Sequence, residues 1–439
     1  MEQLPLKFIQ NLDSHFGSEI RDRILDGLNS EPSVSVRLNS SKPSNRFENE
    51  KPVPWSNHGR LLTERPNFAL DPLFHAGVYY VQDSSSMVLE EVLRQLEFDH
   101  DGILALDACA APGGKSIILS DYLSHKGFLI CNEVDTKRNN ILSENLMKWG
   151  SAHHGVTQLS SEKIASLHVT FDLILVDAPC SGEGMFRKDD YAIKQWSDSL
   201  VEQCALTQRN VLNDLSDSIN EGGYLIYSTC TMNPHENETQ VERLIQEGFE
   251  IALPDLSDFV DFILPANGLG YYLLPGISTG EGLFISVLRK TGISSSKRLK
   301  QPMKLKPFDQ QSAGAFSNTQ FTNQWTKSNE AFGVIDPFGV LSNIPANMPF
   351  KSLGLPAFEI KGKDTIPLHG LAMTPTSKLD VNLNLEQALE FLRKNNISLE
   401  NLSNKKWLLL GYEGIALGWV KNIPGRLNNY YPSHFRLRS

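Results

Sequence analysis

Between residues 100 and 290, short apolar runs alternate with longer segments in which apolar residues recur at helical spacing. A short apolar run bounded by turn residues is typical of a buried strand, and the longer segments are typical of amphipathic helices. The predicted strands are 103–107, 128–133, 156–159, 171–177, 224–228 and 283–288. The predicted helices are 115–124, 136–149, 199–220 and 234–246. This alternation predicts an α/β fold, in which a doubly wound, Rossmann-like parallel sheet is covered by helices on both faces.

Changes in the pattern divide the chain into five predicted segments. They are an N-terminal unit over 1–75, the α/β domain over 76–292, a basic linker over 293–308, an intermediate unit over 309–370 and a C-terminal unit over 371–439. The first combines a helix-like start, Phe8–Leu12, with the alternating segment Ser33–Leu38, which predicts a small α+β domain. The last is predicted to be β-rich, because Gly, Asn and Pro separate three strand-like segments, 407–411, 414–419 and 430–437.

Charge changes this picture only locally. The 439 residues carry a net charge of −10, which by itself does not indicate nucleic-acid binding. Two stretches are nevertheless basic: 288–310, with Asp309 as its one acid, and 405–439, with Glu413 as its one acid. Their basic residues are Arg289, Lys290, Lys297, Arg298, Lys300, Lys304 and Lys306 in the first, and Lys405, Lys406, Lys421, Arg426, Arg436 and Arg438 in the second. Either stretch alone is as typical of a solvated surface, but together they are compatible with a track that contacts phosphate groups.

Composition argues against several classes of protein. The chain has no run of about 18 apolar residues, so no membrane span is expected. The start, Met1–Pro5, lacks a basic region followed by an apolar one, which favours the cytoplasm. The cysteines are odd in number and none is spaced Cys-x-x-Cys, so neither a disulfide framework nor a metal site is predicted. Three of them, Cys109, Cys131 and Cys204, are interpreted as packing or incidental residues, although Cys109 could contact a ligand through its backbone.

Residues that follow the strands carry the functional signal, because ligands of a doubly wound sheet bind beyond the carboxyl ends of its strands. After the first strand, Asp107–Ser116 is rich in Gly, Ala and Pro, which lets backbone N–H groups approach a nucleotide-like ligand. Glu133 follows the second strand about twenty residues later, where a carboxylate can accept hydrogen bonds from ribose hydroxyls. Both features also occur without a ligand, as a tight strand-to-helix turn and as an ordinary strand-end acid.

The same loop leaves two other classes of function open. Gly114-Lys115-Ser116 fits the end of a P-loop, and the strand 171–177 could place a magnesium-binding Asp177, as in a nucleotide triphosphatase. Against this, Cys109 stands where a P-loop needs its first glycine, and a P-loop protein has no use for Glu133. A catalytically silent RNA-binding assembly factor would keep the fold without turnover.

Two cysteines, Cys180 and Cys230, follow the fourth and fifth strands. These strands should lie side by side in a doubly wound sheet, so both thiols should open onto one cleft. A single strand-end cysteine is usually a small packing residue, but two at neighbouring strand ends favour covalent chemistry. Beyond Cys230, Asn233 is predicted to cap the last helix, with Pro234 at its first position and Glu236 completing a box-like pair.

Three segments resemble motifs of the Sun-type RNA cytosine-5 methyltransferases: Asp107–Ser116, Asp177–Gly184 and Ser228–Glu236. The resemblance extends to Gly77–Ser86, to Gly280–Phe284 and to the pair Arg37 and Asn39. In the tail, Gly418–Lys421 and Leu427–Pro432 resemble the PUA-like RNA-binding unit of bacterial members that modify small-subunit ribosomal RNA. The resemblance implies a methyltransferase sheet between N-terminal and C-terminal RNA-binding domains. It also implies S-adenosyl-L-methionine as cofactor, structured RNA such as 16S ribosomal RNA or the subunit as partner, a monomer and no membrane.

The resemblance implies a mechanism in which a thiolate adds to carbon 6 of cytosine and so makes carbon 5 able to take a methyl group. It assigns Cys230 as the nucleophile and Cys180 to release of the methylated base, although residue type alone does not choose between them. Asp177 is expected to meet the cytosine N3 and amino edge, and Lys115 to favour the thiolate.

The implied cofactor site needs no metal. Its expected residues are Cys109, Ala110, Ala111, Pro112, Gly113, Gly114, Lys115, Glu133, Arg138, Ser160 and Asp177. One position departs from the family, which usually has an acid after the third strand, where this chain has Ser160. A hydroxyl accepts a hydrogen bond more weakly than a carboxylate, so lower cofactor affinity is expected unless Glu162 substitutes.

Overall fold

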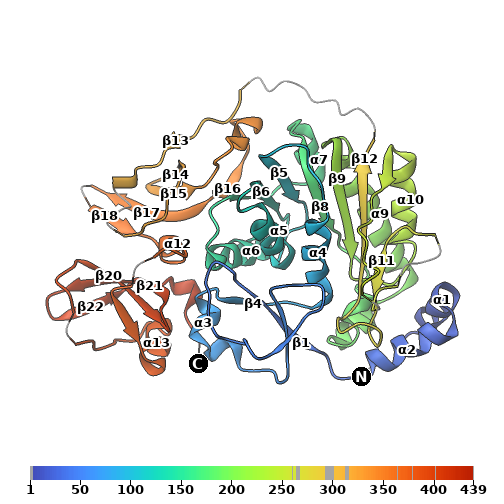
Figure 1. Cartoon of the computed structure of the whole chain (residues 1–439), viewed down its shortest axis with the longest axis horizontal. Helices are drawn as coiled ribbons and strands as arrows, with labels where there is room; N and C mark the ends of the chain where they lie inside the picture. Colours follow the sequence, from blue (N-terminus) through green and yellow to red (C-terminus); the bar gives the residue numbers. More distant parts are fainter. Residues whose placement is uncertain are drawn as a thin grey trace.

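The computed structural model of the chain describes residues 3–259, 261–263, 267–291, 301–311, 316–362, 364–377, 379–400 and 402–438. Its centre is one large sheet (Figure 1). The strands of this sheet are β5 (Ile103–Asp107), β6 (Gly127–Asn132), β7 (His154–Thr157), β8 (Phe171–Asp177), β9 (Ile219–Thr229), β10 (Phe249–Ile251), β11 (Tyr271–Leu273), β12 (Leu283–Lys290) and β16 (Phe350–Leu353). They are ordered β10-β12-β9-β8-β5-β6-β7-β16, and β11 also pairs with β12.

The predicted doubly wound sheet is confirmed in five parallel strands, β5 to β9. The chain moves outward from β5 through β6 to β7, then returns to β8 and β9 on the other side of β5. The strand order therefore reverses between β5 and β8, which is where a ligand is expected. The sixth predicted strand is present as β12, but it runs antiparallel to β9 because β11 delivers the chain to it as an antiparallel neighbour.

Apolar residues of successive strand positions enter two different cores. On β5, Leu104 and Leu106 belong to one core, whereas Ile103 and Ala105 belong to the other. Because side chains of a strand alternate between its faces, this split shows that both faces of the sheet are covered. The covering helices include α4 (Val88–Arg94), α5 (Gly114–Leu123), α6 (Thr136–Trp149), α7 (Ser161–Ser166), α8 (Asp190–Gln195), α9 (Asp198–Ser216) and α10 (Glu238–Gln246).

The predicted start of the last helix is wrong. Helix α10 begins at Glu238, and the preceding residues 234–237 form a turn. The side chain of Glu236 does not return to the helix, because it accepts hydrogen bonds from the loop that follows β8 instead.

The N-terminal unit contains two helices, α1 (Leu6–Phe16) and α2 (Ser18–Leu28), and a small sheet. That sheet has the order β2-β3-β1-β4, with β1 at Val34–Leu38, β2 at Lys51–Pro52, β3 at Gly59–Leu62 and β4 at Tyr79–Val81. Strand β4 lies beyond residue 75 and pairs antiparallel with β1. From β1, the buried Arg37 reaches the α/β domain, where its guanidinium pairs with Glu90 of α4 (2.5 Å) and Asp121 of α5 (2.8 Å).

The C-terminal half contains two further small sheets. The first has the order β13-β14-β15-β17-β18, formed by β13 (Lys306–Pro307), β14 (Asn323–Lys327), β15 (Glu330–Val334), β17 (Leu355–Lys361) and β18 (Asp364–Pro367). The second has the order β19-β20-β21-β22, formed by β19 (Val381–Leu383), β20 (Trp407–Tyr412), β21 (Ile415–Ile423) and β22 (Arg426–Asn429). Between β15 and β17, the chain leaves the first of these sheets, and strand β16 pairs antiparallel with β7 of the central sheet.

The last predicted strand, 430–437, is wrong. Residues 433–435 form a 3₁₀ helix after Pro432, and the apolar side chains of this segment enter a core together with helix α13 (Leu385–Leu392). The alternation of apolar residues here reflects the packing of Tyr431, Phe435 and Leu437 on that helix. The ladder partners of β21 are β20 and β22.

Several basic residues of the predicted phosphate track form contacts within the chain. Lys290 is buried and donates to the Ser216 carbonyl (3.2 Å), whereas Lys405 and Lys406 pair with Asp380 (2.6 Å) and Asp364 (2.8 Å). Lys297, Arg298 and Lys300 lie outside the described residues.

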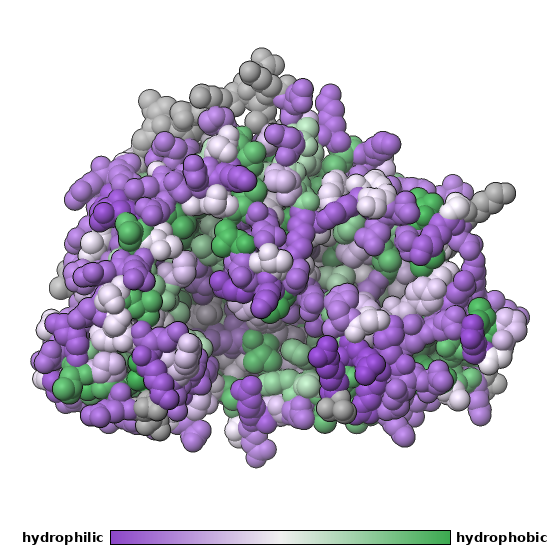
Figure 2. Space-filling model, turned by 180° about the vertical axis from the view of Figure 1, so that it is seen from behind, coloured by the Kyte–Doolittle hydropathy of each residue, from purple (hydrophilic) through white to green (hydrophobic). Residues whose placement is uncertain are grey.

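The surface adds two observations. The face shown in Figure 2 is mostly hydrophilic, with apolar residues in separate small patches, as is usual for a surface in contact with water. None of the helices in the described ranges has the length and apolar character that crossing a bilayer would need.

Candidate active site

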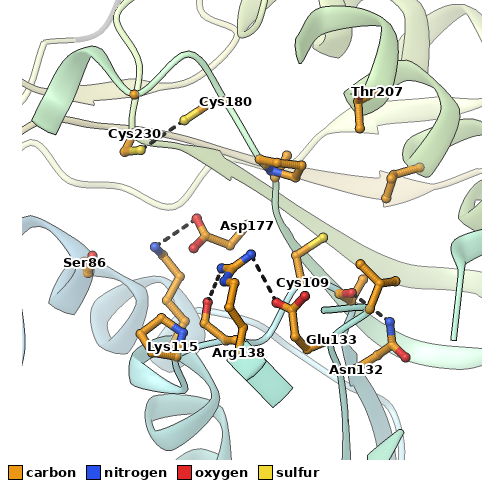
Figure 3. Close-up of a pocket in the computed structure, with 18 of the residues that line it drawn as sticks. Ser86, Cys109, Lys115, Asn132, Glu133, Arg138, Asp177, Cys180, Thr207 and Cys230 are labelled. Atoms are coloured by element: carbon orange, nitrogen blue, oxygen red, sulfur yellow. Dashed lines mark hydrogen bonds and ion pairs between the residues drawn. The ribbon is translucent and has the colours of Figure 1, made fainter. Parts of the chain in front are cut away.

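A cavity of about 770 Å³ opens at the carboxyl ends of β5, β6, β8 and β9 (Figure 3). It lies at the predicted reversal of strand order. The site residues predicted from the sequence that line it are Cys109, Ala111, Pro112, Lys115, Glu133, Arg138, Ser160, Asp177, Cys180 and Cys230. In Figure 3 the two cysteine sulfurs face each other at one end of the cavity, and Glu133 lies towards the other end.

The Gly-rich loop between β5 and α5 forms one wall. Three residues expected to contact the cofactor, Ala110, Gly113 and Gly114, are not among the lining residues. The amide of Ala110 donates to the Asn132 carbonyl (2.8 Å), so it is not available to a ligand. Gly113 has a φ of 115°, a left-handed conformation that glycine adopts readily, and it is the N-cap of α5. These residues therefore shape the turn, whereas Cys109, Ala111 and Pro112 face the cavity.

Glu133 directly follows β6 and is 3 % exposed. One of its oxygens accepts the Asp135 N–H (2.9 Å), and the other pairs with Nη1 of Arg138 (3.3 Å). Arg138 also donates through Nη2 to the Ala111 carbonyl (2.7 Å), so it joins the Gly-rich loop to the start of α6. The carboxylate is thus held at the cavity wall, in a position where it can accept hydrogen bonds from ribose hydroxyls.

Asn132 is a lining residue that the sequence analysis missed. Its Nδ2 donates to the carbonyls of Ala108 (3.2 Å) and Leu159 (2.9 Å), and its Oδ1 accepts the Leu159 N–H (2.9 Å). This side chain therefore ties together the loops that follow β5 and β7. The available signal was its place as the last residue of β6, immediately before Glu133.

Ser160 lines the cavity and also caps helix α7, because its Oγ accepts the Lys163 N–H (3.3 Å). Glu162, the residue considered as a substitute for the missing acid, is exposed and is not a lining residue. The structure thus offers a hydroxyl where the family usually has a carboxylate.

Cys180 and Cys230 are brought together by the pairing of β8 with β9, in which Asp177 is in register with Ser228. Their sulfur atoms are 3.0 Å apart. The hydrogen bond to Cys230, burial and the nearby charges of Cys230 and Glu236 raise the pKa of Cys180 well above that of a free thiol. Cys180 therefore keeps its proton, and its thiol lies where it can donate a hydrogen bond to the Cys230 sulfur.

Lys115 and Asp177 form an ion pair beside the cysteines, with 2.9 Å between Nζ and Oδ1. Burial opposes the charge of Lys115, but Asp177 outweighs it and, together with Cys230 and Asp107, raises the pKa of Lys115. The Lys115 cation therefore persists close to Cys230. Asp177 also accepts the Ser228 hydroxyl (2.8 Å), which fixes its carboxylate at the cavity.

The wall of the cavity contains a second group of charged residues, to which the sequence analysis assigned no role. Glu281 pairs with Nε of Arg187 (2.6 Å) and Nζ of Lys188 (3.0 Å). Lys188, Glu281 and Asp83 line the cavity. Asp83 and Glu281 lie in segments that carry the family resemblance, and this was the only signal in the sequence.

Three family models match consecutive parts of the chain. The model described as 16S rRNA methyltransferase RsmB/F matches residues 94–289, the N-terminal domain of 16S rRNA methyltransferase RsmF matches 4–84, and the methyltransferase RsmF PUA domain matches 378–437. The central domain belongs to the RsmB/F family of 16S rRNA methyltransferases.

Relatives of this RsmB/F-family methyltransferase include ribosomal RNA small subunit methyltransferase F of Aeromonas hydrophila, which is 29 % identical over 87 % of this chain and 84 % of the relative. The protein of the same name from Aliivibrio salmonicida is 28 % identical over 91 % of this chain and 90 % of the relative. Among solved structures, a methyltransferase homologue from Pyrococcus horikoshii is 28 % identical, with a TM-score of 0.55 over 64 % of this chain and 93 % of the homologue. The structure of NSun6 from Pyrococcus horikoshii shares the fold, with a TM-score of 0.56 and 21 % identity over 66 % of this chain and 98 % of NSun6.

S-adenosyl-L-methionine is the cofactor of this family, and the cavity fits it. The loop at Cys109 lines the cavity with small side chains, Glu133 would accept hydrogen bonds from ribose hydroxyls, and the cysteine pair lies at the opposite end, where the methyl group would be needed. The match to a methyltransferase family argues against the alternative of a nucleotide triphosphatase. Lys115, which such an enzyme would use to bind phosphate, is paired with Asp177 beside the cysteines.

We expect Ser160→Asp to tighten binding of S-adenosyl-L-methionine roughly fivefold, because a carboxylate is a stronger acceptor than a hydroxyl by about 1 kcal/mol. Aspartate also caps helices well, so α7 should be preserved. Isothermal titration calorimetry would measure the dissociation constant. Ser160→Asn is the matched control, because it keeps the cap without the charge. Equal affinity of Ser160→Asp and Ser160→Asn would contradict the expectation.

Proposed function

We propose that this protein transfers a methyl group from S-adenosyl-L-methionine to carbon 5 of a cytosine in small-subunit ribosomal RNA, through a covalent bond between Cys230 and carbon 6. The observation that carries the proposal is the pair of sulfur atoms 3.0 Å apart, next to the Lys115–Asp177 ion pair and at the end of the cofactor cavity. Two thiols in one methyltransferase site fit a reaction that needs a nucleophile and a base on the same ring. The RsmF-like N-terminal and PUA domains, and the names of the relatives, support ribosomal RNA as the substrate.

Cys230 is assigned as the nucleophile because Lys115 interacts with it electrostatically, whereas the contact with Cys230 and burial raise the pKa of Cys180. Lys115 supplies a cation, and the Cys180 thiol can donate a hydrogen bond to the Cys230 sulfur. The Cys230 thiolate forms a bond to carbon 6, and the ring electrons move towards carbon 5 and N3. Asp177 lies at the cavity beside these groups, and its carboxylate would accept a hydrogen bond from the amino group at the N3 edge of the cytosine.

Bound S-adenosyl-L-methionine supplies an electrophilic methyl group, which carbon 5 accepts. The hydrogen on carbon 5 must then leave as a proton, so that the bond between Cys230 and carbon 6 can break and the ring can recover its aromaticity.

Cys180 is assigned to this second stage. In the free enzyme, the bond to Cys230 is the largest cause that raises the pKa of Cys180. Once Cys230 is bonded to carbon 6, this cause is removed, so Cys180 can release its proton to water and act as a base. Its thiolate then takes the proton from carbon 5 and Cys230 leaves as a thiolate.

A paired cytosine cannot enter this cavity while stacked in a helix, so the target base must be unpaired or flipped out. Small-subunit ribosomal RNA made without modifications would be incubated with the protein and with cofactor carrying an isotope-labelled methyl group. We expect the label in 5-methylcytidine after digestion to nucleosides, at a limited number of positions. Comparison of naked RNA with assembled subunits would identify the preferred substrate. Label in another nucleoside would refute the cytosine assignment, and no label in either substrate would favour a silent assembly factor.

A further inference from the structure

Two buried carboxylates belong to the loops that contain the cysteine pair. Glu183 is 1 % exposed and belongs to the loop that contains Cys180, whereas Glu236 is 0 % exposed and belongs to the loop that contains Cys230. Neither is a lining residue of the cofactor cavity. Each carboxylate binds the loop to which it does not belong, so the two loops hold each other reciprocally.

Glu236 holds the loop of Cys180. Its Oε2 accepts the backbone N–H of Ser181 (2.9 Å) and Nε2 of Gln208 (2.8 Å), and its Oε1 accepts the Ser181 hydroxyl (2.5 Å). Gln208 also donates to the Pro179 carbonyl (3.0 Å). The residues immediately before and after Cys180 are therefore both fixed by this group.

Glu183 holds the loop of Cys230. Its Oε2 accepts the backbone N–H of Met232 (2.8 Å), and its Oε1 accepts Nε1 of Trp196 (3.0 Å). Beside it, the Gly184 N–H donates to the Cys230 carbonyl (2.8 Å). A Cβ at Gly184 would lie 3.0 Å from that oxygen, which is tighter than most Cβ contacts, so this close approach favours glycine.

Stability alone does not favour two carboxylates at this place. Burial raises the pKa of Glu183 to about 7 and also raises that of Glu236, which means that the fold opposes their charge. The main-chain and side-chain groups that contact these two carboxylates are hydrogen-bond donors, as an ionised carboxylate requires. An arrangement that is costly to charge and yet fully supplied with donors favours a role in geometry.

We propose that Glu183 and Glu236 are positioning residues that set the separation between the sulfur atoms of Cys180 and Cys230. The consequence for catalysis rests on the function proposed above, whereas the separation itself can be measured without RNA. Diamide provides this measurement, because it takes the two thiol hydrogens onto its nitrogen–nitrogen double bond while the two sulfurs form a disulfide. The rate of disulfide formation reports how often the sulfurs come within bonding distance.

We expect rapid formation of the Cys180–Cys230 disulfide in the wild-type protein and formation at least roughly tenfold slower in Glu236→Ala, because the loop of Cys180 loses its anchor. Peptide mapping after alkylation would identify the bond. Charge predicts the opposite change: Glu236 raises the pKa of Cys180, so its removal would favour the thiolate and speed the reaction. A slower rate therefore reports geometry. Glu238→Gln is the matched control, because Glu238 is also buried, at 4 % exposed, but bonds to Tyr272 instead.

Amide substitutions give a second, sharper test. At Glu236, a glutamine can keep its oxygen on the two N–H donors, while its NH₂ donates to the Ser181 hydroxyl, which can turn towards Thr231 (3.0 Å). At Glu183 each carboxylate oxygen accepts an N–H donor that cannot reverse, so an amide NH₂ must face one of these donors. We expect Glu236→Gln to form the disulfide at nearly the wild-type rate, and Glu183→Gln to form it several-fold more slowly.

Catalysis supplies the last measurement. We expect Glu236→Ala to lower kcat for methyl transfer by roughly 100-fold while the dissociation constant of S-adenosyl-L-methionine stays unchanged, and Glu236→Gln to restore most of kcat. The positioning role is wrong if folded Glu236→Ala forms the disulfide at the wild-type rate, or if the wild-type protein forms no such disulfide. Slow disulfide formation in the variants of a protein that methylates no RNA would support the positioning role and refute the proposed function.

Discussion

Replacing Cys230 by alanine is expected to abolish methyl transfer to RNA, whereas replacing Cys180 by alanine is expected to trap a protein–RNA adduct that survives denaturant. The first variant lacks the thiolate that bonds to carbon 6. The second keeps that thiolate next to Lys115 but lacks the base that removes the proton from carbon 5. In Cys180→Ala, attack therefore proceeds and release stalls.

Denaturing gels of the protein with labelled RNA would detect the adduct, and nucleoside analysis would measure methyl transfer. Cys204→Ala is the control, because Cys204 lies on α9 and is not a lining residue of the cavity. We expect it to retain wild-type transfer without an adduct. An adduct in Cys230→Ala and none in Cys180→Ala would exchange the two roles. Equal transfer by both cysteine variants and the wild type would refute covalent catalysis.

Replacing Arg37 by methionine is expected to lower the free energy of unfolding by about 3 kcal/mol at pH 7, because two acids lose their partner inside the protein. The Arg37 side chain is 1 % exposed and contacts Glu90 and Asp121 at 2.5 and 2.8 Å. Urea denaturation followed by circular dichroism would measure the change. Arg94→Met is the matched control, since Arg94 pairs with Glu91 at the surface of α4, the helix that also carries Glu90. We expect it to leave the unfolding midpoint nearly unchanged.

The same variant predicts a dependence on pH. Burial would raise the pKa of Glu90, but His58, Arg37 and Ser56 lower it to about 2. A depressed pKa stabilises the folded state above the usual value of about 4.5 and loses this contribution as the pH falls towards 2. The deficit of Arg37→Met should therefore be smaller at pH 3 than at pH 7, since Glu90 can take up a proton once its partner is missing. A deficit that is equal at both values would assign the loss to packing alone.

The sequence predicted those parts of the site that follow from local pattern and from sheet topology. The proximity of Cys180 and Cys230 could be predicted because each follows a strand, and neighbouring parallel strands end at the same edge of a sheet. Asn132 could not be found in this way, because its function depends on carbonyl groups that follow two other strands. Glu236 was assigned to a helix cap because its local spacing fits one, whereas its actual partner, Ser181, is distant in the chain.

The same limit applies to the fold. The alternation of apolar runs was sufficient for β5 to β9, whose partners are dictated by right-handed connections through helices. It was not sufficient for 430–437, where the apolar residues pack on α13 and form no ladder. In both cases the missing information was the identity of a partner far along the chain.

Strand β16 has a consequence for how the protein can be divided. It comes from the C-terminal half, yet it supplies the hydrogen-bonded neighbour of β7, the strand that leads to Ser160 at the cofactor cavity. A fragment that ends after β12 would leave the backbone N–H and C=O groups at this edge of β7 without hydrogen-bond partners. Such an exposed edge can pair with a strand of another chain. The shortest catalytic piece should therefore extend past Leu353, and the part of the chain that follows the methyltransferase domain is a structural component of that domain.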